Sequence, residues 1–164
     1  MLQRGVGLVL RRQPASHPLT SVRAALSSSH KHNTPQGLPM PAPAFLVEDN
    51  ALIRHSLIPT MEELGDTQVV GVAEGQADAI AWLTRDHAAD WRLAVIDLFL
   101  KDGSGLGIVE ACQRRRPDQR VVVLSNYATP AMRERCTELG ANAVFDKSSE
   151  LEEFLAYCGS LSVH

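Results

Sequence analysis

The sequence predicts an α/β fold with a doubly wound, five-stranded parallel sheet. Five short apolar segments recur from residue 44 onward, and a segment with helical spacing of apolar residues follows each of them. The apolar segments are continuous and do not alternate with polar residues, which is typical of parallel strands covered by helices on both faces. Right-handed crossovers then place functional groups at the carboxyl ends of the strands.

The five predicted strands share consecutive branched or aromatic apolar residues, which favour extended backbone. They cover residues 44–48, 67–73, 93–98, 120–125 and 142–146. Because a helical segment separates each strand from the next, the connections are crossovers and the strands are expected to be parallel.

The first predicted helix covers residues 51–64, with apolar side chains at helical spacing from Ile53 to Leu64. Pro59 lies inside this helix and predicts a kink or a restart, because proline has no N–H to donate. Gly65 stands where the helix C-cap belongs.

The four later helices are marked by apolar residues three or four positions apart. These are Ala77, Ile80 and Ala81, then Ile108, Val109 and Cys112, then Met132, Cys136 and Leu139, and finally Leu151, Phe154, Leu155 and Cys158. Gly140 marks the end of the fourth helix. The three cysteines all fall at such positions, so we expect reduced core thiols in a cytosolic protein.

The sequence divides into three expected parts. Residues 1–42 are interpreted as a disordered or mis-started leader, residues 43–160 as the folded domain, and residues 161–164 as a tail. The leader is rich in Ser, Pro, His and Arg without periodicity. Its apolar stretch at 6–10 is too short for a secretory signal. Met40 stands directly before the first strand, which favours the interpretation that the reading frame was started too early.

The charge distribution disfavours nucleic acid as a partner. All 19 acidic residues lie after residue 44, where 11 basic residues accompany them. The run from Arg114 to Arg116 is interpreted as the charge complement of a helix C-terminus. No apolar run approaches the roughly 18 residues of a membrane span. We therefore expect a cytoplasmic protein that binds neither nucleic acid nor a membrane.

Polar residues follow or end four of the predicted strands. These are Glu48 and Asp49 at the first, Asp97 at the third, Ser125 at the fourth and Lys147 at the fifth. The carboxyl ends of neighbouring parallel strands converge, so these side chains are expected to share one pocket. Three carboxylates repel one another unless a cation neutralises them, and oxygen ligands suit Mg²⁺. Lys147 and Ser125 suit a phosphoryl group, which makes Asp97 a candidate nucleophile.

Four segments resemble the landmarks of the receiver domain of two-component response regulators, the CheY-like fold. They are FLVEDN, VIDLFLKDGSGLG, VVVLSNYA and VFDKSSE, in the matching order and spacing. The resemblance covers residues 43 to 159. It implies that Asp97 takes a phosphoryl group from a histidine kinase or phosphotransfer protein. It also implies that Ser125 and Lys147 then bind that group.

The same resemblance implies a magnesium site. Its ligands would be Asp49, Asp97 and the main-chain carbonyl of Phe99, and Glu48 would act indirectly, through water or neighbouring bonds. The protein would then be a phosphoacceptor with at most slow self-dephosphorylation, and not an enzyme.

Three positions depart from the family pattern. Lys101 stands where many receivers have proline, and Ser148 stands where a cis-proline is common. Val144 stands where an aromatic switch residue usually lies. Tyr127 or Phe145 is the candidate to replace that aromatic.

Two other classes of protein place an aspartate or a phosphate site on a similar sheet. A phosphatase of the haloacid dehalogenase type needs a second acid where this sequence has Phe99. A flavodoxin-like protein needs a glycine- and hydroxyl-rich loop after the first strand, where this sequence reads EDNAL. A degenerate receiver, which binds proteins without being phosphorylated, stays open as the alternative.

The short stretch after the last predicted helix favours a stand-alone receiver that signals by binding an unknown downstream protein. We expect it to be a monomer or a phosphorylation-dependent dimer.

Overall fold

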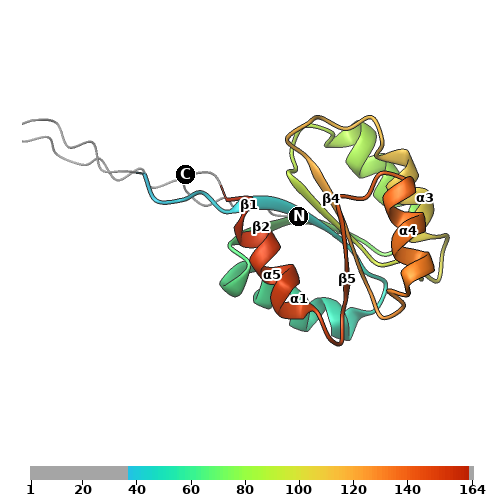
Figure 1. Ribbon diagram of the computed structural model, residues 1–164. Coiled ribbons are helices and arrows are strands. Elements are labelled where there is room, and N and C mark those ends of the chain that lie inside the picture. The colour runs from blue at the N-terminus through green and yellow to red at the C-terminus, as the bar shows by residue number, and fades with distance from the viewer. Residues whose placement is uncertain (1–36, 163–164) are drawn as a thin grey trace, which may run out of the picture. The chain divides into compact units, whose positions relative to one another are not determined.

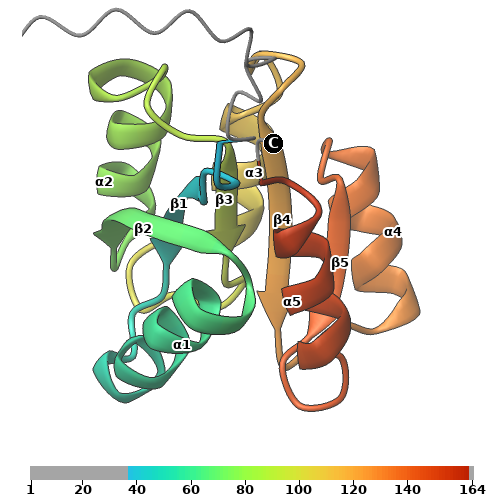
Figure 2. The same cartoon turned by 90° about the vertical axis from the view of Figure 1, so that its left-hand side faces the viewer.

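The computed structural model describes residues 37–162 and shows one five-stranded parallel sheet with helices on both faces (Figures 1 and 2). The strand order is β2-β1-β3-β4-β5, which is the doubly wound arrangement that the sequence predicts. The expectations for residues 1–36 and 163–164 lie outside the described residues. Within the described range, no helix is long and apolar enough to cross a membrane.

The strands lie close to their predicted positions. They are β1 (Ala42–Val47), β2 (Thr67–Ala73), β3 (Leu93–Ile96), β4 (Arg120–Ser125) and β5 (Ala143–Asp146). The prediction of a third strand over 93–98 was two residues too long, because pairing with β1 and β4 ends at Ile96. Asp97 therefore begins the loop after β3 and does not lie within the strand.

Six helical segments connect or follow the strands. They are α1 (Ala51–Leu64), α2 (Gln76–Ala81), the π-helical segment η1 (Trp82–Asp86), α3 (Gly105–Ala111), α4 (Pro130–Glu138) and α5 (Leu151–Gly159). α1 runs without interruption through Pro59, so the helix does not restart there. Pro59 is exposed, and a backbone carbonyl left without its usual donor at such a position can bind water.

Two apolar layers hold the helices on the sheet. α1 and α5 cover one face with residues such as Met61 and Phe154, whereas α2, α3 and α4 cover the other (Figure 1). The three cysteines are buried free thiols within these layers, as predicted. Burial raises the pKa of Cys112 to about 11 and that of Cys158 to about 12.

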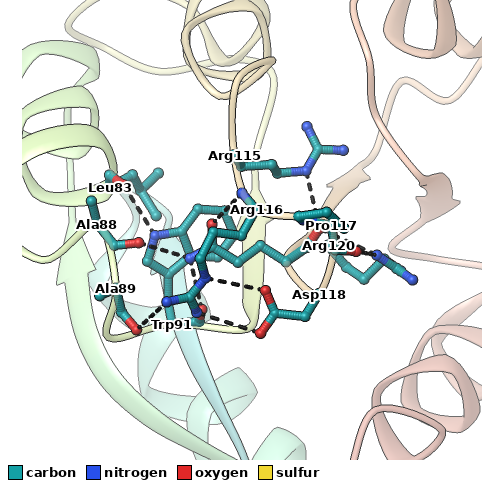
Figure 3. Close-up of polar contacts among 10 residues, drawn as sticks. Leu83, Ala88, Ala89, Trp91, Arg115, Arg116, Pro117, Asp118 and Arg120 are labelled. Carbon is teal, nitrogen blue, oxygen red and sulfur yellow. Dashed lines mark hydrogen bonds and ion pairs between the residues drawn. The ribbon is translucent and has the colours of Figure 1, made fainter.

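The arginine run after α3 caps helix ends at the edge of the sheet where β4 begins. Arg115 donates to the carbonyl oxygens of Cys112 (3.0 Å) and Gly140 (2.7 Å), which follow α3 and α4. Arg116 pairs with Asp118 at 3.1 Å (Figure 3). The interpretation of this run as a helix C-terminal complement is confirmed for Arg115.

Candidate functional site

The polar residues predicted to converge lie together at the carboxyl edge of the sheet. Glu48 and Asp49 follow β1, Asp97 follows β3, Ser125 ends β4 and Lys147 follows β5. These four strands are neighbours, so the fold itself brings their ends together. Carboxylate oxygens of the three acidic residues lie within 4.8 Å of one another.

Lys147 is the cation at the centre of this cluster. Its Nζ lies 2.6 Å from Glu48 Oε2 and 3.3 Å from Asp97 Oδ2. The Glu48 side chain is only 2% exposed, and it also accepts a hydrogen bond from the Asn50 N–H at 3.2 Å. A buried carboxylate is tolerated when it is paired and hydrogen-bonded in this way.

The surroundings of Asp97 disfavour the charged form of its carboxyl group. Burial raises the pKa of its carboxyl above the ordinary value, and the negative charge of Glu48 acts in the same direction. The ammonium of Lys147 and a hydrogen bond from the Phe99 backbone lower that pKa in part. A carboxylate whose negative charge is destabilised by burial and by a second carboxylate attracts a cation, and it is able to attack an electrophile.

Asp49 is held by the loop after β3. Its Oδ2 accepts a hydrogen bond from the main-chain N–H of Lys101 at 2.7 Å. The same loop is closed by a bridge between Phe99 and Ser104. It returns into α3 at Gly105, where an added Cβ would lie only 2.1 Å from the Asp97 carbonyl oxygen. The backbone after Asp97 is therefore packed too tightly for a side chain at this turn.

The hydroxyl of Ser125 is fully buried beside the cluster. Its Oγ accepts a hydrogen bond from the Tyr127 N–H at 3.2 Å, and its carbonyl accepts one from the Lys147 N–H at 3.1 Å. Ser125 is thus tied to the loop after β4 and to the residue after β5. A movement of this hydroxyl toward Asp97 would be transmitted to both segments.

The two aromatic candidates for a switch lie in different places. Tyr127 is 59% exposed and contacts Phe99 edge-on, with ring centroids 4.6 Å apart. Phe145 instead packs edge-on against Phe154 and Tyr157 of α5. Tyr127 is therefore the candidate beside the Asp97 loop, whereas Phe145 belongs to the layer beneath α5.

An arginine binds the backbone of Val144, the residue that stands where an aromatic switch residue is usual. Arg133 on α4 donates to the carbonyl oxygens of Ala128 and Val144, each at 2.9 Å, and pairs with Glu150 just before α5. One guanidinium thus joins the loop after β4, strand β5 and the start of α5. The Lys147–Ser148 peptide, where a cis-proline is common in receivers, is trans.

Sequence reasoning missed Arg133 and also Arg54. Arg54 on α1 donates to the main-chain oxygen of Glu48 and pairs with Glu74, both at 2.7 Å. Both arginines bind backbone carbonyl oxygens, which every residue type carries. Their acceptors therefore leave no signal in the sequence, and only the three-dimensional arrangement identifies them.

The donor set fits a hard divalent cation. Three carboxylates lie together, and one ammonium pairs with two of them, which leaves an excess of negative charge; the available ligands are oxygens only. This chemistry suits Mg²⁺ with retained waters. Asp49 and Asp97 are half-buried and reachable, whereas buried Glu48 is engaged by Lys147 and Asn50.

Comparison with known proteins agrees with this geometry. The family model for the response regulator receiver domain matches residues 44–158. The acid tolerance regulatory protein ActR of Rhizobium meliloti is 35% identical over 112 residues, covering 68% of this chain and 55% of ActR. The photosynthetic apparatus regulatory protein RegA of Cereibacter sphaeroides is 36% identical over 111 residues, covering 66% and 56%. The chain spans about half the length of these curated relatives.

Solved structures share the fold. The signal receiver domain of the putative response regulator NarL from Mycobacterium tuberculosis superposes with a TM-score of 0.63 at 22% identity, covering 74% of this chain and 98% of that one. A response regulator from Burkholderia pseudomallei, solved with a phosphorylated aspartic acid, calcium ion and citrate, gives 0.59 at 25% identity. That match covers 70% of this chain and 65% of the other.

Proposed function

Because the chain belongs to the response regulator receiver family of two-component signalling, we propose that Asp97 accepts a phosphoryl group from the phosphohistidine of a histidine kinase or phosphotransfer protein. The observation that carries this proposal is the cluster of three carboxylates at one end of the sheet, two of which pair with Lys147. The phosphorylated protein then signals by binding a downstream protein. Self-dephosphorylation is at most slow, and the protein is otherwise not an enzyme.

Each side chain has a defined task in the transfer. An Asp97 oxygen attacks phosphorus, the new P–O bond forms as the P–N bond to the donor histidine breaks, and the imidazole nitrogen takes up a proton. Lys147 leaves Asp97 and pairs with a phosphoryl oxygen, and Ser125 donates its hydroxyl to another. Asp49, Asp97 and the Phe99 carbonyl would hold Mg²⁺, which shields the charge of the phosphoryl oxygens.

The proposal is tested by phosphorylation of variants. Wild-type protein incubated with a phosphorylated histidine kinase or acetyl phosphate, together with Mg²⁺, should gain a phosphoryl group, and Asp97→Asn should not. Asp102→Asn is the matched control, because Asp102 is an exposed acid in the same loop. Labelling of Asp97→Asn at the wild-type yield would remove Asp97 as the acceptor. Partner binding that is equal in wild-type and Asp97→Asn would favour the degenerate receiver instead.

A further inference from the structure

We propose that the main-chain N–H of Lys101 is a positioning group for the metal site. It would hold the carboxylate of Asp49 and the loop that carries Phe99 in one arrangement that is ready for Mg²⁺. This inference rests on the proposed function, and it assigns a role to a backbone group and not to a side chain.

The bond connects two parts of the site that are far apart in the sequence. The Lys101 N–H and Asp49 Oδ2 are 2.7 Å apart although the residues are 52 positions apart. With this bond in place, an Asp49 oxygen still lies within 4.8 Å of ligand oxygens of Glu48 and Asp97. A carboxylate has two oxygens and about four lone-pair sites, so it is able to accept the N–H and face a cation simultaneously.

The bond also anchors the tip of the loop after β3. At its far end this loop is fixed by the bond from the Ser104 N–H to Gln76 Oε1 at 2.7 Å and by Gly103, whose φ is +89°. These anchors reach α2 and the start of α3. The Lys101 bond ties the tip to the end of β1, so Asp49 and the Phe99 backbone are positioned together.

Residue identity matters here because proline cannot make this bond. Proline has no N–H, and this chain has lysine where many receivers have proline. Outer-shell hydrogen bonds orient metal ligands, and their loss typically reduces metal affinity by about 10- to 100-fold. The departure at position 101 thus gives this chain a hydrogen bond at a place where proline would supply only stiffness.

The Lys101 side chain is not needed for the proposed positioning of Asp49. Lys101 is exposed, so its ammonium is screened by water. A variant that keeps the N–H and removes the charge separates the two contributions. Lys101→Ala does this, and Lys101→Pro removes both the charge and the N–H.

The experiment compares Mg²⁺ dissociation constants of wild-type, Lys101→Ala and Lys101→Pro, measured by calorimetry on proteins whose circular dichroism is native. We expect Lys101→Ala to bind like wild-type and Lys101→Pro to bind about tenfold more weakly. Equal affinity in Lys101→Pro and wild-type would overturn the inference, as would equal weakening in both variants.

A second measurement tests the hydrogen bond between Lys101 and Asp49 without changing residue 101, so it also applies if the proline variant does not fold. In wild-type protein, the Lys101 amide proton should resonate downfield because it is bonded to a carboxylate. It should move upfield in Asp49→Ala, by more than the amide proton of Gly103 does. A Lys101 resonance that Asp49→Ala leaves in place would contradict the bond.

These outcomes are separate from those of the proposed function. At saturating Mg²⁺, Lys101→Pro should still be phosphorylated on Asp97. Failure of wild-type phosphorylation together with weakened Mg²⁺ binding in Lys101→Pro would remove the proposed function alone. Normal phosphorylation with unchanged Mg²⁺ affinity would remove this inference alone.

Discussion

At the scale of single residues, Lys147 is the counter-charge of Glu48 and Asp97. It reaches Glu48 and Asp97 from the end of β5, and its own side chain is only 13% exposed. Removing the ammonium leaves the buried carboxylate of Glu48 without a counter-charge. Breaking a buried pair in this way is costly, because the remaining charge is neither hydrated nor compensated.

Lys147→Met should therefore lower the free energy of unfolding by about 3 kcal/mol at neutral pH without Mg²⁺. Urea unfolding followed by circular dichroism measures this, and added Mg²⁺ should restore part of the loss. Lys101→Met is the control, because that lysine is exposed and should change stability little. A Lys147→Met protein as stable as wild-type would show that Glu48 does not depend on this cation.

Because the thiols of Cys112 and Cys158 are buried, the free energy of unfolding is expected to fall at alkaline pH. The pKa of Cys112 rises from 9.0 to about 11 on folding, and that of Cys158 rises from 9.0 to about 12. Below about pH 9 these thiols stay protonated in both states. Above it the unfolded thiols ionise first, so the free energy of unfolding should fall as the pH rises from about 9 toward 11.

Urea unfolding at about pH 8 and pH 10.5 measures this dependence. Cys158→Ala should show a smaller decrease between the two pH values than wild-type, because one shifted thiol is gone. An identical decrease in both proteins would mean that other groups cause it. Native thiols should also resist a water-soluble alkylating reagent at pH 8, and unfolding in urea should expose them to it.

At the scale of elements, the start of α3 is fixed by a glycine. A Cβ on Gly105 would lie 2.1 Å from the Asp97 carbonyl oxygen and 2.7 Å from Leu98 Cα, and backbone atoms cannot move aside easily. Gly105→Ala should lower the free energy of unfolding by about 1–3 kcal/mol and weaken Mg²⁺ binding, since the loop after β3 must shift.

Gly159→Ala is the matched control for this substitution. Gly159 ends α5, and nothing lies within 4 Å of an added Cβ. Alanine there should leave stability unchanged or raise it by up to about 1 kcal/mol. Equal stabilities of the two alanine variants would contradict the close approach of α3 to the Asp97 backbone.

Arg133 is the link between α4, β5 and α5. Its bonds to the carbonyl oxygens of Ala128 and Val144 should be lost in Arg133→Met. Amide hydrogen exchange should then accelerate in residues 126–129. Arg135→Met is the control on the same helix, because Arg135 is exposed and pairs with Glu138. Similar exchange in both variants would show that Arg133 does not restrain the loop.

Sequence patterns predicted the bounds of several elements closely. The bounds of β2, β4 and α1 match the predictions because their apolar spacing is regular throughout. The strand expected over 93–98 was too long because Leu98 is apolar yet packs in the loop after pairing has stopped. The grouping of Glu48, Asp49 and Asp97 followed from parallel strand ends alone. The contacts of Lys101 and Arg133 did not, because main-chain groups make them.

At the scale of the whole molecule, hydrogen bonds and one ion pair connect the site to α4 and to the start of α5. Ser125 joins the loop after β4, Arg133 joins that loop to β5, and Glu150 continues the path to α5. A phosphoryl group carries charge of about −2 and strong acceptor oxygens, so it should draw in the Ser125 hydroxyl and Lys147. A shift of a few kcal/mol in a pre-existing equilibrium is sufficient for a switch.

Beryllofluoride, a phosphoryl mimic, should therefore change amide hydrogen exchange across residues 126–158, in addition to the loop after Asp97. The comparison is between protein with Mg²⁺ alone and protein with Mg²⁺ and beryllofluoride. Asp97→Asn, treated identically, should show no change. Altered exchange confined to residues 98–104 would show that phosphorylation does not change the surface formed by residues 126–158.

Asp97 is expected to accept a phosphoryl group in a pocket that Asp49 and Lys147 complete. Tandem mass spectrometry of the wild-type chain, after incubation with acetyl phosphate with and without Mg²⁺, tests this directly. We expect one hydroxylamine-sensitive phosphoryl group, located on Asp97 and dependent on Mg²⁺. A phosphoryl group on another residue, or none in the presence of Mg²⁺ and donor, would contradict it.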